Sequence, residues 1–288
     1  MSKTVVIQKR KRSVTYRIIQ ILLYAAIILL SVICLLPFLM MIVNATRSGN
    51  EIMTSFSLIP GSSLSPNWAI VKKNLNIPRG FLNSIFIAVV STALTAYFSA
   101  MTAFGFAFYK FKGNKVIFTI ILIFMMIPSQ LGLLGFYDLM VKFGLIDSYI
   151  PLIIPAMAAP ATVFFLRQYL LSVMPKALLE APRIDGASEF YIFHKIGLPI
   201  MAPGIATMCI GSFIGSWNSY LMPLIILNSE KKWTLPVMVA SLGSVKDIAS
   251  NIGATYVTVA ISVVPILLAF CFFSKYIISS ISSGSVKE

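Results

Sequence analysis

Long apolar runs separated by short polar segments dominate the pattern of this chain. Six of these runs hold about 20 apolar residues or more, which is enough for an α-helix to cross the hydrocarbon core of a bilayer. The expected spans are residues 18–43, 81–108, 116–137, 150–171, 200–227 and 256–281. Prolines inside or beside them predict kinks or local breaks at Pro37, Pro128, Pro155, Pro160, Pro223 and Pro265. The pattern therefore predicts an all-α integral membrane protein with six transmembrane helices.

Composition agrees with this class. Hydrophobic residues make up 58% of the 288 residues, charged residues make up 11%, and the mean hydropathy is +0.90, whereas soluble domains are about a quarter charged. The runs are too long for the short alternating strands of a membrane barrel. Residues 1–17 form a basic tail that includes "KRKR". The apolar run after this tail is about twice as long as the core of a signal peptide. We therefore expect a retained anchor and one membrane domain over residues 18–288.

The net charge of +14 would suit a nucleic-acid-binding protein, but the positions of the basic residues argue against that class. They cluster at the ends of apolar runs, where the positive-inside rule places them, and they form no continuous basic face interleaved with aromatic residues. With the N-terminus inside, fifteen of the 23 Lys and Arg residues fall in inside segments, three of them in the turn "YKFKGNK". This asymmetry predicts a multi-pass protein with both termini in the cytoplasm.

One dense polar segment lies between the fourth and fifth apolar runs. Residues 180–199 read "EAPRIDGASEFYIFHKIGLP". They include three acidic residues, one arginine, one lysine and the only histidine of the chain. The pattern from Pro175 onward predicts two short helices. Gly186 can end the first helix, and Asp185 or Ser188 can cap the second. A helical hairpin with small residues at its turn can enter a groove of another protein, whereas a solvated cytoplasmic loop is the plainer interpretation.

The spacing within this segment resembles the cytoplasmic loop of ATP-binding-cassette importer permeases, whose signature is E-A-A, three residues, G, nine residues and I-x-L-P. The matching positions are Glu180, Ala181, Gly186, Ile196, Leu198 and Pro199. Other stretches are similar to the sugar-importing branch, and specifically to its maltose-permease-like second subunits. They include "FLNSIFIA" from residue 81, "MMIPSQ" from 125, "FIGSWNSYLMPLIIL" from 213 and "WTLPV" from 233. Pro182 departs from the signature, because the family usually has its second alanine there.

The resemblance implies a type I importer permease that forms half of a translocation pathway for a sugar, and we expect that sugar to be an oligosaccharide. The implied partners are a second, different permease subunit, two ATPase subunits and an extracellular or periplasmic sugar-binding protein. The implied location is a bacterial or archaeal cytoplasmic membrane, in contact with lipid. Residues 175–199 would be the coupling loop that docks in the ATPase. The residues implied in this contact are Glu180, Ala181, Arg183, Asp185, Gly186, Ile196, Leu198 and Pro199.

Substrate recognition in a membrane cavity requires hydroxyl or amide hydrogen bonds, and aromatic faces against which sugar rings can pack. The candidates for the substrate path are Asn83, Gln130, Tyr137, Trp217, Asn218 and Tyr220. The alternative for each is structural, since amides tie membrane helices together and Trp and Tyr collect at the membrane interface. The resemblance further implies that the loop of residues 228–255 reaches toward the sugar site of the binding protein.

No enzymatic or metal chemistry is expected of this chain. It contains no G-x-x-x-x-G-K-[ST] phosphate loop, so we expect no bound cofactor here and ATP with Mg²⁺ on the partner ATPase. Cys34, Cys209 and Cys271 lie in apolar runs without metal-ligand or disulfide spacing, so no metal site is expected. For His194 we expect a cytoplasmic contact rather than a pH sensor.

Two other functions compete with the importer. An ion-gradient-driven secondary transporter is the main alternative, and it would need carboxylates inside the membrane. All nine acidic residues of this chain fall in loops or at the edges of spans. A receptor or scaffold that holds ATPases without transport is the second alternative, and the full-length family resemblance argues against it.

Overall fold

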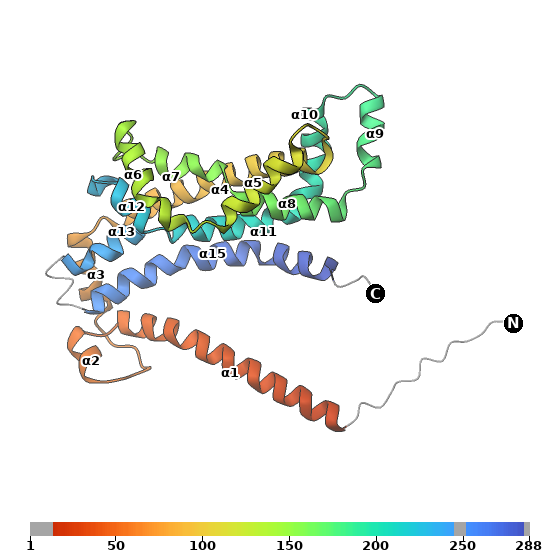
Figure 1. The fold of residues 1–288 in the computed structure, drawn as a ribbon. Coiled ribbons are helices and arrows are strands. Elements are labelled where there is room, and N and C mark those ends of the chain that lie inside the picture. The colour runs from red at the N-terminus through yellow and green to blue at the C-terminus, as the bar shows by residue number, and fades with distance from the viewer. Residues whose placement is uncertain (1–13, 245–251, 285–288) are drawn as a thin grey trace.

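A computed structural model describes residues 14–244 and 252–284, and within these residues the chain is helical and has no strand (Figure 1). The longer helices in chain order are α1 (Val14–Ala45), α3 (Leu64–Asn74), α4 (Ile77–Phe108), α5 (Asn114–Met126), α6 (Leu133–Lys142), α8 (Pro160–Val173), α9 (Ala177–Ile184), α11 (Leu198–Trp217) and α15 (Ile252–Gly284). The shorter elements are α2 (Gly49–Thr54), η1 (Ser129–Gly132), α7 (Ile150–Ile153), η2 (Ile154–Met157), α10 (Glu189–Ile192), η3 (Phe193–Gly197), α12 (Leu221–Ile226), η4 (Glu230–Lys232), α13 (Leu235–Ala240) and η5 (Ser241–Ser244).

The helices confirm the all-α membrane class. Four segments are long and apolar enough to cross a bilayer, namely Thr15–Ala45, Ile77–Phe108, Ile150–Val173 and Glu189–Trp217. The pair Asn114–Met126 and Gln130–Lys142 would make a fifth span if the two helices count as one. The sixth expected span lies within α15, whose apolar stretch Ile252–Leu268 is shorter. The number of six spans therefore stays a prediction.

Two of the expected spans are interrupted in the structure. Residues 116–137 bend by 88° between α5 and α6, where Pro128 lacks the N–H that a continuing helix needs. Residues 200–227 form α11, which ends at Trp217, and the separate α12. Pro223 falls in the first turn of α12, where a backbone N–H would have no intrahelical acceptor. The sequence predicted kinks or local breaks at Pro128 and Pro223. The first break lies at Pro128, whereas the second lies before Pro223, at residues 218–220.

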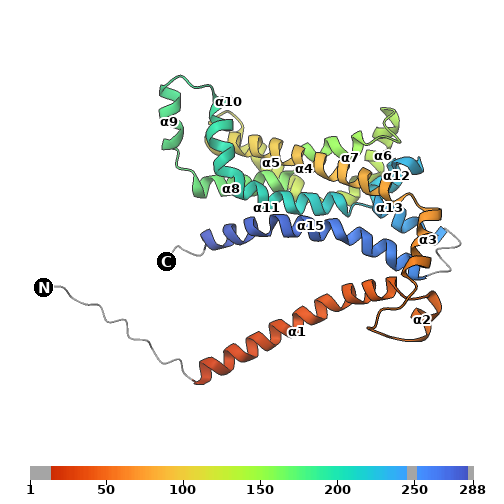
Figure 2. The ribbon, with the colours of Figure 1, turned by 180° about the vertical axis from the view of Figure 1, so that it is seen from behind.

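The ends of the helices sort into two groups. Helices α9 and α10, the start of α1 and the end of α15 lie at one end of the molecule (Figures 1 and 2). Helices α2, α3, α6, α12 and α13 lie at the opposite end in both views. This arrangement is the one that the charge asymmetry requires if residues 175–199 and both termini share one side of the membrane.

Helix α4 is the centre of the packing, since it lies against both α8 and α11. Ala100 and Ala103 are fully buried on it, and small residues of this kind let membrane helices approach closely. Gly197 is a similar close approach, because a Cβ atom there would lie 2.8 Å from the Phe104 ring. By contrast, α1 leaves the bundle beyond its contact with α15 and exposes most of its apolar side chains.

Candidate functional site

The 175–199 segment folds as two helices joined by a tight turn. Helix α9 ends at a left-handed glycine, Gly186, whose φ is +76°. The Gly186 N–H donates to the Arg183 carbonyl at 3.1 Å, and the Ala187 N–H donates to the Pro182 carbonyl at 2.9 Å. This pair of bonds is the Schellman arrangement, which favours glycine at this position. Pro182 lies inside α9 without ending it, and Pro175 lies in the turn before the helix rather than in its first position.

The second helix begins at Ser188. Its hydroxyl accepts a hydrogen bond from the Tyr191 N–H at 3.2 Å, which resolves the choice between Asp185 and Ser188 as the cap. The helix continues past α10 through the π-helical segment η3 into α11, and Pro199 lies in the first turn of α11. The wider π turn accommodates Pro199, whose nitrogen cannot donate to a preceding carbonyl. The second helix of the segment is therefore continuous with α11.

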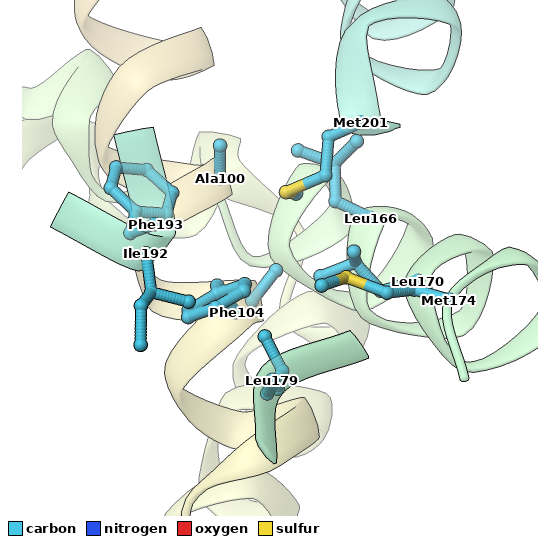
Figure 3. Packing of buried hydrophobic residues seen from close by; sticks show 10 residues of the cluster. Ala100, Phe104, Leu166, Leu170, Met174, Leu179, Ile192, Phe193 and Met201 are labelled. Carbon is cyan, nitrogen blue, oxygen red and sulfur yellow. The ribbon is translucent and has the colours of Figure 1, made fainter. Parts of the chain in front are cut away.

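An apolar cluster fixes the 175–199 segment to the membrane helices (Figure 3). Leu179 of α9 is only 1% exposed, and Ile192 and Phe193 are also buried. They pack with residues of α4, α8 and α11, which include Phe104, Leu166, Leu170 and Met201. Ile196 and Leu198, two of the predicted coupling residues, pack at the edge of this cluster. The segment is thus a docked element and not a solvated loop.

A polar triad of Tyr109, Arg183 and Glu189 attaches the 175–199 segment to the membrane helices at a second point. Arg183 and Glu189 form an ion pair across the turn, with the Arg183 Nε and a Glu189 carboxylate oxygen 2.8 Å apart. The Tyr109 hydroxyl donates to the other carboxylate oxygen at 2.5 Å, and the Arg183 guanidinium lies over the Tyr109 ring. Burial, and then the bond to Glu189, raise the pKa of Tyr109 to about 12, so the phenol stays a donor at neutral pH.

The lone histidine makes a further link to α4. The Nδ1 atom of His194 lies 2.8 Å from the Phe190 carbonyl, and its Nε2 atom lies 3.2 Å from the Tyr97 hydroxyl. The neutral tautomer with the proton on Nδ1 satisfies both contacts. His194 therefore has a structural partner on each side of its ring.

The outer face of the 175–199 segment presents charge beside apolar side chains. Glu180, Ala181, Arg183, Asp185, Gly186 and Pro199 are all exposed. Ile184 is 86% exposed, and Leu178, Phe190 and Tyr191 are exposed as well. Apolar side chains gathered on a surface outside the membrane helices are typical of a protein contact.

A cavity of about 550 Å³ lies toward the opposite end of the helices. Helices α4, α11, α12 and α6 form its walls, together with the broken stretch from α7 to α8. Its polar lining consists of hydroxyl groups, from Ser84, Ser91, Thr95, Ser212, Ser216, Ser219 and Thr234. Among the residues that the structure describes, no charged side chain lines this cavity. We call this space the hydroxyl-lined cavity.

Two of these hydroxyls compensate for the break between α7 and α8. Pro160 has no N–H to donate to the Ala156 carbonyl. The Thr95 hydroxyl donates to that carbonyl instead, at 2.7 Å. The Ser91 hydroxyl donates to the Leu152 carbonyl in the same way, at 3.3 Å. These bonds hold the interrupted backbone against α4 and satisfy its carbonyl groups.

None of the six predicted path residues is among the described residues that line this cavity. Trp217 is 2% exposed, and its Nε1–H donates to the Ser262 carbonyl at 3.1 Å. The Asn83 amide donates to the Lys231 and Trp233 carbonyls at 3.1 and 2.9 Å. Gln130, Asn218 and Tyr220 are exposed, and Tyr137 is half-buried. A role for these residues in the substrate path stays a prediction.

The hydroxyl residues were missed because serine and threonine are common in membrane helices. A signal was nevertheless present, since Ser212, Ser216 and Ser219 follow the i, i+4, i+7 spacing of one helix face. Ser84, Ser91 and Thr95 repeat on one face of α4 in a similar manner. Only the packing of α4 against α11 brings the two rows together.

The loop after α12 is held to the loop before α7 by Asp147. Its carboxylate accepts from the Ser229 N–H and hydroxyl at 3.0 and 2.6 Å, and from the Lys232 ammonium at 3.0 Å. These donors, with the Ser229 bonds first, hold the pKa of Asp147 well below its usual value. Part of the predicted 228–255 loop, residues 245–251, lies outside the described residues. In the described part of the chain, no group of three or more His, Cys, Asp or Glu side chains could hold a metal ion.

Known transport permease proteins are similar in sequence to this chain over most of its length. The Arabinooligosaccharides transport system permease protein AraQ of Halalkalibacterium halodurans is 36% identical over 97% of this chain and 99% of its own length. The Diacetylchitobiose uptake system permease protein NgcG of Streptomyces coelicolor is 32% identical over 92% of this chain and 88% of its own length.

The same relationship is visible in solved structures and in family models. A chain of a bacterial ABC transporter involved in the import of the acidic polysaccharide alginate superposes with a TM-score of 0.80 at 20% identity, over 93% of this chain and 99% of that one. This likeness shows the shared fold. The family model for the binding-protein-dependent transport system inner membrane component matches residues 96–282. The chain therefore belongs to the family of binding-protein-dependent transport system inner membrane components.

Proposed function

We propose that this chain is a permease subunit of an ATP-driven, binding-protein-dependent importer of oligosaccharides. It would form half of the translocation pathway beside a second, different permease subunit. Two ATPase subunits would bind on the cytoplasmic side, with ATP and Mg²⁺, and a sugar-binding protein on the other side. The relatives named for arabinooligosaccharide and diacetylchitobiose uptake support this substrate class. The family match favours this function over an ion-gradient-driven transporter.

The observation that carries the proposal is the construction of the 175–199 segment. Its inner face is buried in the apolar cluster of Leu179, Ile192 and Phe193, while Ile184 and Phe190 are exposed on its outer face. A rigid element with an apolar, charge-rimmed outer surface suits docking in a cleft of the ATPase. Because α10 continues into α11, movement of the docked element would reach the walls of the hydroxyl-lined cavity. We therefore propose residues 175–199 as the coupling loop.

Orientation follows from the same assignment. If the coupling loop binds a cytoplasmic ATPase, then the start of α1 and the end of α15 also face the cytoplasm, because they lie at the same end of the molecule. The Asp147–Ser229 loops would then face the binding protein.

The test is ATP hydrolysis by this chain purified in lipid with its partner permease and ATPase. We expect hydrolysis to rise when a binding protein loaded with arabinotriose or diacetylchitobiose is added, and to stay basal with the unloaded protein. A complex that hydrolyses ATP but responds to no loaded binding protein would contradict the proposed function.

A further inference from the structure

The turn between α4 and α5, which reads "YKFKGNK", forms a second pocket of the molecule. This pocket is open and has a volume of about 470 Å³, and Lys110 and Lys115 line it beside the apolar side chains of Phe111 and Val116. Its volume lies within the range of small-molecule sites, which is roughly 300–1,000 Å³. We call this space the basic pocket.

The turn that carries the two lysines is held in one shape. The Asn114 amide donates to the Tyr109 carbonyl at 3.0 Å, and Gly113 opens α5 with a φ of +89°. Gly113 has no side chain to offer, so in the described part of the chain no side chain caps the first N–H groups of α5. Such groups favour an anion, and the backbone therefore adds to the attraction of the lysines.

The protein does not neutralise the charge of the basic pocket. Within the residues that the structure describes, neither Lys110 nor Lys115 forms an ion pair. The carboxylate that the Tyr109 hydroxyl brings to this end of α4 belongs to Glu189, which is already paired with Arg183. The two lysines are thus available to an anion from outside the chain.

An apolar stripe leads away from the basic pocket along α5. None of the residues Asn114–Met126 is buried, and the helix packs mainly on α8. Val116, Ile120, Ile123 and Ile127 are all exposed, and their spacing of i, i+4, i+7 and i+11 places them on one face. At a rise of about 1.5 Å per residue the stripe is about 16 Å long, which matches the hydrocarbon depth of one leaflet, about 15 Å.

We propose that the basic pocket binds the headgroup of an anionic phospholipid of the cytoplasmic leaflet, with Lys110 and Lys115 on the phosphate and an acyl chain along the stripe of α5. Phe111, which is 44% exposed, lies where aromatic side chains favour the membrane interface. The leaflet rests on the proposed function, because the bond between Tyr109 and Glu189 places the turn at the end of the proposed coupling loop. Tyr109 lines the pocket too, so the lipid would adjoin the bond that ties this loop to α4.

The experiment is photolabelling of the complex of this chain, its partner permease and ATPase in nanodiscs. The probe is phosphatidylglycerol with a diazirine in its acyl chain, at graded mole fractions in phosphatidylcholine, and peptide mass spectrometry follows the label on residues 106–127. We expect saturable labelling of the wild-type complex. Lys110→Gln and Lys115→Gln should each raise the half-saturating mole fraction about fivefold, which is the effect of one lysine near anionic headgroups. Lys115→Arg keeps the charge and should label like the wild type.

Lys112→Gln is the matched control, since Lys112 is exposed in the same turn but does not line the pocket. Its half-saturating fraction should change much less. Equal shifts in all three glutamine variants would overturn the proposal, because they would mean a diffuse attraction without a site. Two further results would also overturn it. One is displacement of the label by soluble glycerophosphoglycerol, which would indicate a site for a free anion. The other is loss of the ATPase from the Lys110→Gln and Lys115→Gln complexes with unchanged labelling, which would indicate a protein contact.

The proposed function is tested separately, by stimulation of ATP hydrolysis with a loaded binding protein in the same nanodiscs. Stimulation of the wild-type complex together with any of the contrary labelling results would leave that function standing and remove only the lipid site.

Discussion

Tyr109 and Glu189 meet across 80 positions of sequence, and the Tyr109 hydroxyl donates to the Glu189 carboxylate at 2.5 Å. Tyr109 is the residue that follows α4, and Glu189 opens α10. The bond therefore ties the 175–199 segment to the central membrane helix as well as to α8 and α11, its neighbours in sequence. A segment held at several points moves as one body with the helices it contacts.

Removal of this bond should loosen the link between ATP hydrolysis and transport. Tyr109→Phe and Glu189→Gln each delete one partner, and for such exposed contacts the loss is about 0.5–1 kcal/mol. We expect fewer saccharide molecules transported per ATP in proteoliposomes, with the ATPase still bound. In a double-mutant cycle, the double variant should resemble Glu189→Gln, because that change alone removes both the bond from Tyr109 and the ion pair with Arg183. Strictly additive effects would show that the two residues act independently.

Gly186 should tolerate few replacements. Its φ of +76° costs other L-residues about 1–2 kcal/mol, although no neighbouring atom would contact a Cβ there. Gly186→Val should therefore reduce co-purification of the ATPase and abolish uptake, while Gly186→Asn should retain more of both, since asparagine enters this region more readily. Gly211→Ala is the control, because Gly211 lies within α11 with open space around it. Equal behaviour of the valine and asparagine variants would argue against a conformational cause.

Leu179 should anchor the first helix of the segment. Leu179→Ala removes a side chain that is 1% exposed, which costs about 2–5 kcal/mol in a well-packed core. We expect faster hydrogen–deuterium exchange of residues 176–192 in the purified permease. The neighbouring Leu178 is 47% exposed, so Leu178→Ala should leave the exchange rate unchanged. An equal increase in both variants would contradict the packing shown in Figure 3.

The loop contact of Asp147 should be insensitive to mild acid. A carboxyl whose pKa is lowered by folding contributes stability that is complete above its unfolded pKa and is lost as the pH falls through the lower folded pKa. For Asp147 the ordinary value is 3.8. Exchange protection of residues 226–234, corrected for intrinsic rates, should thus stay constant from pH 8 to about pH 4.5. Asp147→Asn should reduce protection over this whole range. A decline of wild-type protection between pH 7 and 5 would mean that another group controls the contact.

We expect Trp217 to stabilise the fold and not to bind the saccharide. Trp217→Phe removes the part-buried hydrogen bond from the indole N–H to the Ser262 carbonyl, which costs about 0.5–1.5 kcal/mol. The melting temperature of the complex should fall, and the affinity for neutral saccharides should not change. A weaker saccharide affinity in Trp217→Phe at unchanged melting temperature would instead restore Trp217 to the substrate path.

The sequence alone determined the class of the molecule and the form of the 175–199 segment. Apolar runs of this length can satisfy their backbone hydrogen bonds in lipid only as helices. The turn at Gly186 and the cap at Ser188 are local, because their hydrogen bonds join residues at most five positions apart. The spacing around Glu180 and Gly186 identified the family, which the comparisons confirmed.

Only the tertiary structure decided where helices break and which side chains share a space. Pro128 follows the end of α5. Pro182, Pro199 and Pro223 instead lie inside helices or in their first turn, because the surrounding carbonyls find other partners only where the packing supplies them. Tryptophan and asparagine suit either a sugar site or a helix contact, so residue type could not separate these roles. The serine and threonine residues of α4 and α11 give only a weak indication of a cavity in the sequence. They form one cavity because small residues let the two helices pack closely around a proline-broken neighbour.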